Sequence, residues 1–204
     1  MRPIQPVRAG QVGLSTAAAA RVVLGTALAL HARGRSLPQA IVGARAPGGE
    51  ERHFPARDLV DRVNGTRAFF HAHRHPGDPG GEWGHFHLFV EDARGYSHLA
   101  ALALDERGLP LRWFATSAWV TGETWRAAPE LEHALSCFTL AARGRFAPVA
   151  RWLTAMVALF RPQLARMLAR RDRAAVRHGA RARLAGCSAR LGPRIAALEF
   201  NEVP

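Results

Sequence analysis

Lysine is absent from this chain of 204 residues, and tyrosine occurs only once. All 28 basic side chains are therefore arginines, which outnumber the 16 acidic residues and give a formal charge of +12. A charge of this size would normally suggest nucleic acid or an anionic membrane as a partner. Here the arginines are scattered along the chain, and the missing lysine together with many alanines and glycines is typical of a GC-rich coding bias. We therefore expect no nucleic-acid partner.

Cysteine is also scarce. Cys137 and Cys187 show no CxxC spacing, and we assign them no chemistry. The sequence has no glycine-rich phosphate loop, no GxSxG motif and no Cys–His pairing for nucleophilic catalysis. A chain of this length can bury a core without disulfides or metal staples. It predicts a single domain over residues 1–204, in which residues 1–14 form a flexible arm.

No long hydrophobic run is present. The longest apolar stretch, Val22–Leu30, is far shorter than the ~20 residues that a membrane span needs. We expect it to belong to a packed helix over residues 15–33, with Ser15 as a possible cap and Gly34 at its end. The alternative is an export signal, with Ala27-Leu28-Ala29 as a faint cleavage-like pattern. The first interpretation predicts a cytoplasmic protein.

The middle of the chain predicts strands. Short loops rich in glycine, proline and charged residues separate four apolar segments, which is typical of an antiparallel meander over residues 66–120. These segments are Thr66–His75, Trp83–Asp92, Ser97–Leu104 and Leu111–Val120. Residues 35–60 are expected to be irregular, with at most a short strand near Gln39–Val42 or Glu51–Phe54.

The last third predicts helices over residues 129–180. One is expected over Pro129–Ala142, a second from Pro148 through Phe160, and a third that begins at Pro162. A sheet of this kind needs a cover on one face. The sequence therefore predicts an α+β fold, with a meander of about four strands covered by an N-terminal helix and about three C-terminal helices.

Histidine is the residue that is unusually concentrated. Five histidines occur between positions 71 and 87, as His71-Ala-His73-Arg-His75 and then His85-Phe-His87. Alternate side chains of a strand share a face, so each His-x-His pair directs two imidazoles the same way, about 6–7 Å apart. Imidazole is the commonest ligand for transition metals and is suited to proton transfer near neutral pH.

Strand register decides whether the two pairs meet. If His73 lies opposite His85 or His87, all four imidazoles share one face, whereas pairing with Phe86 separates them. The apolar pattern favours convergence, because the intervening residues then form one hydrophobic face on the other side of the sheet. Those residues are Phe70, Ala72, Phe86, Leu88 and Val90.

A converging cluster predicts a metal site. The expected ligands are His71, His73, His85 and His87, and the expected ions are Zn, Fe, Mn or Ni. Glu82 is expected as a further ligand or as a general base beside a metal-bound water, which makes it the candidate catalytic residue. His98, His53 and Trp119 are expected to line the same site.

Two functions are favoured by the sequence, with a basic nucleic-acid-associated module as a third and weaker alternative. One is a metal-dependent hydrolase or oxidoreductase. The other is a non-enzymatic protein that binds a small molecule or a partner in a metal-free cleft lined by histidine and tryptophan. The histidines could also be purely structural, and no motif specifies the substrate or the oligomeric state.

The chain also resembles an uncharacterised bacterial family, a domain of unknown function. The resemblance rests on the segments His71–His75, Gly81–Phe89, Trp119–Trp125 and Trp152-Leu-Thr, and spans the chain from about His53 onward. It implies no activity, substrate or cofactor. Ala115–Ala118 stands where the family pattern has a Thr-Asn-Arg-like stretch. If that Asn/Arg pair serves the site in relatives, the resemblance implies an altered site in this chain.

Overall fold

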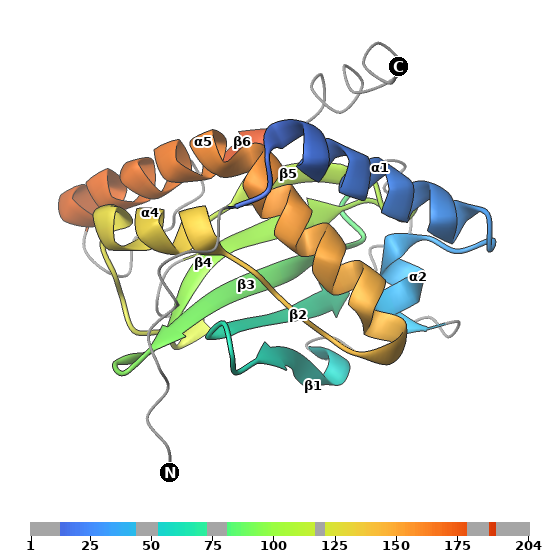
Figure 1. Cartoon of the computed structure of the whole chain (residues 1–204). Coiled ribbons are helices and arrows are strands. Elements are labelled where there is room, and N and C mark those ends of the chain that lie inside the picture. The colour runs from blue at the N-terminus through green and yellow to red at the C-terminus, as the bar shows by residue number, and fades with distance from the viewer. Residues whose placement is uncertain (1–12, 44–52, 73–80, 117–120, 179–187, 191–204) are drawn as a thin grey trace.

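A computed structural model describes the architecture of the chain for residues 13–43, 53–72, 81–116, 121–178 and 188–190. An antiparallel sheet forms one layer, and the three longest helices, α1, α4 and α5, lie together on one of its faces (Figure 1). The predicted α+β class is therefore confirmed. Among the described residues, no helix combines the length and the apolar character needed to cross a bilayer.

The sheet has the order β1-β2-β3-β4-β5-β6, so each strand pairs with its neighbour in sequence. Its strands are β1 (His53–Asp61), β2 (Thr66–Ala72), β3 (Gly84–Asp92), β4 (Gly95–Leu104), β5 (Pro110–Phe114) and β6 (Ser188–Arg190). The four predicted strands correspond to β2–β5, and the structure adds one strand at each edge. The meander prediction is correct, but the strand count was too low.

Residues 35–60 contain more structure than the sequence suggested. Leu37–Val42 is a helix, α2, where a short strand had been considered. Ser36 and Gln39 form a reciprocal capping box, in which the Gln39 side chain accepts a 2.8 Å hydrogen bond from the Ser36 backbone. β1 then extends through Pro55, which an edge strand tolerates because one side of it has no ladder partner.

The helix expected near the N-terminus is α1, Thr16–His31. Ser15 caps it, since its hydroxyl accepts a 3.2 Å hydrogen bond from the backbone nitrogen of Ala18. Ala19 and Val23 are buried, in the cluster that also holds the apolar face of α5. α1 is thus an integral part of the helical layer.

The C-terminal helices differ from the expectation at two points. α4 covers Ala128–Cys137 and ends before the predicted Ala142. The backbone beyond it is bound by the sheet instead, and the Ala141 nitrogen donates a 2.8 Å hydrogen bond to a carboxylate oxygen of Asp61. A short 3₁₀ turn, η1 (Gly144–Phe146), then leads into α5.

α5 is one helix, Ala147–His178, where two separate helices had been predicted. Pro162 lies inside it and removes one backbone donor. Buried Phe160 and Leu164 continue the same apolar stripe across the proline, so packing against the sheet keeps the helix continuous. Figure 1 shows that α5 changes direction along its length, as expected for a helix with an internal proline.

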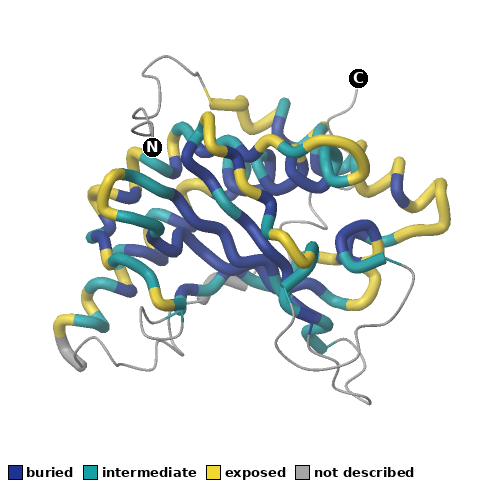
Figure 2. Tube along the Cα trace, turned by 90° about the horizontal axis from the view of Figure 1, so that it is seen from below, coloured by how far each residue is buried: buried dark blue, intermediate teal, exposed yellow. Residues whose placement is uncertain are grey.

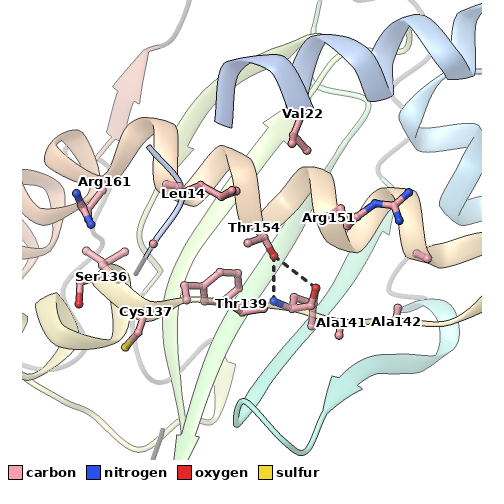
Figure 3. A pocket seen from close by; sticks show the side chains of 16 residues that line it. Leu14, Val22, Ser136, Cys137, Thr139, Ala141, Ala142, Arg151, Thr154 and Arg161 are labelled. Atoms are coloured by element: carbon pink, nitrogen blue, oxygen red, sulfur yellow. Dashed lines mark hydrogen bonds between the residues drawn. The ribbon is translucent and has the colours of Figure 1, made fainter. Parts of the chain in front are cut away.

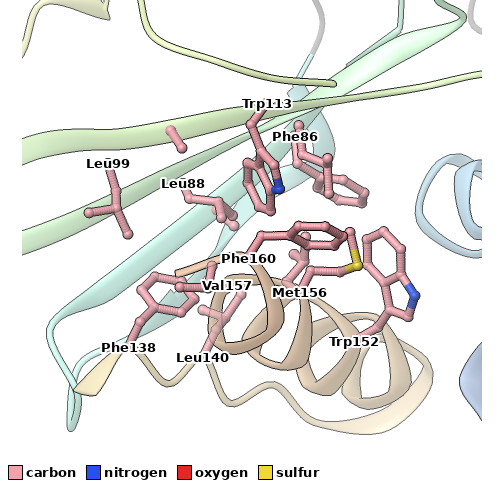
Figure 4. Packing of buried hydrophobic residues seen from close by; sticks show 14 of the residues in the cluster. Phe86, Leu88, Leu99, Trp113, Phe138, Leu140, Trp152, Met156, Val157 and Phe160 are labelled. Atoms are coloured by element: carbon pink, nitrogen blue, oxygen red, sulfur yellow. The ribbon is translucent and has the colours of Figure 1, made fainter. Parts of the chain in front are cut away.

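The hydrophobic core lies between the sheet and α5 (Figure 4). Phe86, Leu88 and Trp113 point from the sheet towards Trp152, Met156 and Phe160 of the helix. Figure 2 shows that the central strands are buried along most of their length. Because neighbouring residues of a strand alternate in direction, the histidines of β2 and β3 must point to the other face.

Candidate metal centre

The register of β2 and β3 brings the histidines together. His71 pairs directly with His85, and Phe69 pairs with His87. On the other side of β2, His53 of β1 pairs with His71. His53, His71 and His85 therefore form a row across three strands, and His87 follows two residues further along the same face.

A register shift adds a fifth histidine. The pairing of β3 with β4 shifts between Leu88 and Phe89, which places His98 opposite Phe89 and on the face of His87. Nδ1 of His87 lies 3.0 Å from Nε2 of His98, and Nδ1 of His98 lies 3.1 Å from the Thr116 hydroxyl. His98, which the sequence expects to line the site, is buried and lies in hydrogen-bond contact with His87.

Three imidazoles lie close enough to share one ion. One ring nitrogen from each of His71, His85 and His87 falls within 4.8 Å of the other two. The Nε2 atoms of His85 and His87 are 2.9 Å apart. With metal–nitrogen bonds of about 2.05 Å, two nitrogens at this separation would subtend an angle of about 90° at the ion. Three imidazole ligands would leave further coordination positions open for water or another ligand.

Glu82 lies behind His85. Its Oε1 is 2.6 Å from Nδ1 of His85, and its Oε2 accepts a 2.5 Å hydrogen bond from Arg112. Burial alone would raise the pKa of Glu82, but His85 and Arg112 outweigh it, so the pKa lies below its ordinary value. A carboxylate on Nδ1 fixes the orientation of the ring and leaves Nε2 for a metal. Sequence reasoning expected Glu82 at the ion or its water, whereas this geometry places it one ring further away.

Position 84, directly before His85, requires a glycine because the two strands approach each other closely there. It is buried between the strands opposite Ala72. A Cβ at this position would meet the ring of Phe70 at 2.6 Å and would press against the carbonyl oxygen of His71. Any larger residue would therefore push β2 and β3 apart at the point where their histidines meet.

Burial favours the neutral form of the inner histidines. The exposed fraction is 4% for His87 and 2% for His98. Burial, followed by the neighbouring imidazoles His98 and His85, lowers the pKa of His87 far below its usual value. Burial, with Arg171 and His85 adding to it, lowers the pKa of His98 to about 3. Neutral imidazole is the form that binds a metal.

The cluster lines a cavity of about 720 Å³ on the face of the sheet that the helices do not cover. The lining combines imidazole, aromatic and hydroxyl groups with one acidic and one basic side chain. It consists of His53, Arg67, Phe69, His71, His85, His87, Phe89, Tyr96, Phe114, Thr116, Thr121, Gly122, Glu123 and Thr124. Its size is within the ~300–1,000 Å³ typical of small-molecule sites.

Asp58 organises one wall of this cavity. One of its oxygens lies 3.0 Å from Nδ1 of His53, and the other accepts a 2.5 Å hydrogen bond from Nε of Arg67. The His53 ring stacks on Phe69, with centroids 3.7 Å apart and planes 8° from parallel. The guanidinium of Arg67 lies over the Tyr96 ring, 5.0 Å from its centroid. His53, which the sequence expects to line the site, therefore lies in the wall of this cavity.

Glu123 enters the cavity from the segment after β5. One of its oxygens accepts a hydrogen bond from the backbone nitrogen of His98. The other is buried, and no residue in the described part of the chain forms a hydrogen bond to it. Burial raises the pKa of Glu123 to about 7, although Arg171 and a hydrogen bond with Thr121 act in the opposite direction.

Some residues expected at the site lie outside the described parts of the chain, and others that lie at the site were not expected. His73, His75 and Trp119 lie outside the described residues. Sequence reasoning missed Asp58, Arg112, Thr116 and Glu123. Of these, Glu123 and Thr116 belong to segments that the sequence had singled out, Trp119–Trp125 and Ala115–Ala118, and the carboxylate of Glu123 is the signal that could have drawn attention to it.

A model of one protein family, described as a domain of unknown function (DUF6969), matches residues 17–187. The chain belongs to this family. The match includes almost all of the helical layer and every histidine of the cluster, in agreement with the resemblance seen in the sequence. No curated protein and no solved structure matches this DUF6969 chain.

Proposed function

We propose that this protein binds a divalent transition metal through ring nitrogens of His71, His85 and His87. The observation that carries the proposal is the convergence of these nitrogens within 4.8 Å of one another on one face of the sheet. Two further features support it. Glu82 is bonded to the distal nitrogen of His85, and burial favours the neutral form of His87.

The contact between His85 and His87 is itself consistent with a metal position. Their Nε2 atoms are 2.9 Å apart, and without an ion one of them must carry a hydrogen for the contact to be attractive. An ion would replace that hydrogen and accept a lone pair from both rings. His87 would then carry its hydrogen on Nδ1 and donate it to His98.

We further propose that the ion serves a hydrolytic or oxidative reaction on a small molecule. Three histidine ligands leave coordination positions free, and a bound divalent ion can activate water or polarise an oxygen of a substrate. In this account Glu82 orients His85, and Glu123 offers an acceptor oxygen to the ligand. Zn, Fe and Mn all accept such donors. We also propose a location in the reducing cytoplasm, which fits with Cys137 forming no disulfide within the described part of the chain.

A second candidate function is non-enzymatic binding of a small molecule. The observation that favours it is the aromatic part of the cavity wall, where Phe69 and Phe89 stack with ring centroids 5.5 Å apart. Such a wall would bind a flat apolar ligand whether or not a metal is present.

Metal analysis separates the two candidates. The protein is purified without a histidine tag, under aerobic and anaerobic conditions, and its metal content is measured by mass spectrometry. We expect about one ion per chain, and loss of that ion in a His85→Ala/His87→Ala double variant. His31→Ala, at an exposed histidine in α1, is the matched control and should retain the ion.

Circular dichroism confirms that the double variant is folded. If the wild type contains no metal in either preparation, and calorimetry detects no binding of Zn²⁺, Fe²⁺ or Mn²⁺, the metal proposal is refuted. Binding of aromatic compounds to that metal-free protein would then support the second candidate.

A further inference from the structure

A second cavity, of about 530 Å³, lies on the opposite side of the sheet from the histidines. It opens to solvent and is bordered by α1, by the first half of α5, by the end of α4 and by the extended segment that follows α4 (Figure 3). None of the residues of the candidate metal centre lines it. It is therefore independent of the function proposed above.

The walls of this cavity are largely apolar. Leu14 and Val22 come from the α1 side, Phe138 and Leu140 from the extended segment, and Ala158 from α5. The Thr154 hydroxyl is already occupied, because it hydrogen bonds to the backbone of Leu140, 3.0 Å from its nitrogen. The interior thus favours a hydrocarbon chain.

Two arginines give the edge of this cavity a positive charge. Arg151 and Arg161 are ten positions apart in α5, or about 15 Å along a helix. Figure 3 shows them on opposite sides of Thr154. No carboxylate lines the cavity, and no residue in the described ranges forms a hydrogen bond or an ion pair with either guanidinium. A positive rim around an apolar interior is complementary to a ligand with an apolar chain and an anionic head.

Gly13 lies at the end of the cavity where Arg161 is found. A Cβ on Gly13 would lie 2.9 Å from the Ser136 carbonyl oxygen and 3.8 Å from a terminal nitrogen of Arg161. The absence of a side chain here lets the backbone that leads into α1 pack against the end of α4, beside Arg161.

We propose that this cavity binds a medium-chain acyl carboxylate, with its chain along α5 and its carboxylate paired with Arg161. The guanidinium presents two parallel donors that match the two carboxylate oxygens. The chain gains free energy from leaving water for the apolar interior, at about 0.8 kcal/mol per buried CH₂ group.

Calorimetric titration of the full-length protein with decanoate tests the proposal, with decan-1-ol as the neutral counterpart. A chelator is present, so that the carboxylate cannot bind a metal ion at the histidines. We expect saturable binding of decanoate, and a dissociation constant about tenfold higher for decanol, as expected when a charged hydrogen bond is lost.

Three variants localise the binding. Arg161→Gln should weaken decanoate binding about tenfold and leave decanol unchanged, while Arg151→Gln, its matched control, should change neither by more than about twofold. Ala158→Phe should abolish binding of both, because the ring fills the cavity. Thermal melting shows whether this variant is folded.

The proposal is overturned if decanoate does not bind, as would happen if residues 1–12 of the chain itself occupied the cavity. It is also overturned if decanoate binds folded Ala158→Phe as well as wild type, or if Arg161→Gln leaves its dissociation constant unchanged. Failure of the metal proposal would alter none of these measurements.

Discussion

Replacement of Glu82 by glutamine tests how the metal centre is held together. Glu82 bonds to Nδ1 of His85 through one oxygen and to Arg112 through the other. Glutamine keeps the shape of the side chain but removes its negative charge. The hydrogen bond to His85 is therefore weakened, and Arg112 loses its anionic partner. Loss of such a partner typically lowers metal affinity about 10- to 100-fold, or about 1.4–2.7 kcal/mol.

The assay is competition between the protein and a chromogenic zinc chelator at pH 7.5. Glu106→Gln, at an exposed glutamate in the turn after β4, is the matched control and should leave the zinc affinity unchanged. Circular dichroism confirms that both variants are folded. If Glu82→Gln binds zinc within twofold of wild type, Glu82 does not position His85, and our assignment of the role of Glu82 is refuted.

Three further changes have expected outcomes. Because burial lowers the pKa of His98 to about 3, unfolding exposes an imidazole that binds a proton below pH ~6.5. As pH falls from ~6.5 towards about 3, His98 should cost the metal-free protein up to about 1.4 kcal/mol of stability per pH unit, in addition to the contribution of His87. His98→Gln should therefore make the urea-unfolding profile less steep, whereas an identical profile would contradict the shift. Gly84→Ala should lower the free energy of unfolding by about 1–3 kcal/mol through overpacking. Gly25→Ala, in α1, should instead raise it by about 0.5–1 kcal/mol, because the added Cβ meets no atom within 4 Å. Equal effects of the two substitutions would refute the close approach at Gly84. Trp152→Ala, at a core residue that is 1% exposed, should cost about 3–5 kcal/mol in the same assay, and a loss below 1 kcal/mol would show that the core is arranged differently.

Local patterns in the sequence predicted the sheet well. The alternation in Phe70–Ala72 and Phe86–Val90 indicated which face is apolar, and this face fixed the direction of His71, His85 and His87. The pattern carries this information because a strand places alternate residues on opposite faces.

The helical region was predicted less accurately, because tertiary contacts override local signals there. Pro162 normally ends a helix, yet α5 continues through it since buried Phe160 and Leu164 pack on both sides. In contrast, the capping pair Ser36 and Gln39 was a local signal for α2 that the sequence analysis overlooked.

The partners of the histidines could not be predicted. Thr116 reaches His98 only because β3 and β4 shift register at a bulge, and Arg112 reaches Glu82 across the sheet from β5. No periodicity in the sequence encodes such contacts. A site of this kind is therefore recognisable from its histidines but not from the residues that orient them.

X-ray absorption spectroscopy of the zinc-loaded protein tests the central claim most directly. We expect imidazole scattering from three nitrogen ligands at about 2.0–2.1 Å, decreasing by one ligand in His71→Ala. A coordination shell of oxygen atoms alone, or a spectrum that is the same in wild type and His71→Ala, would contradict the account.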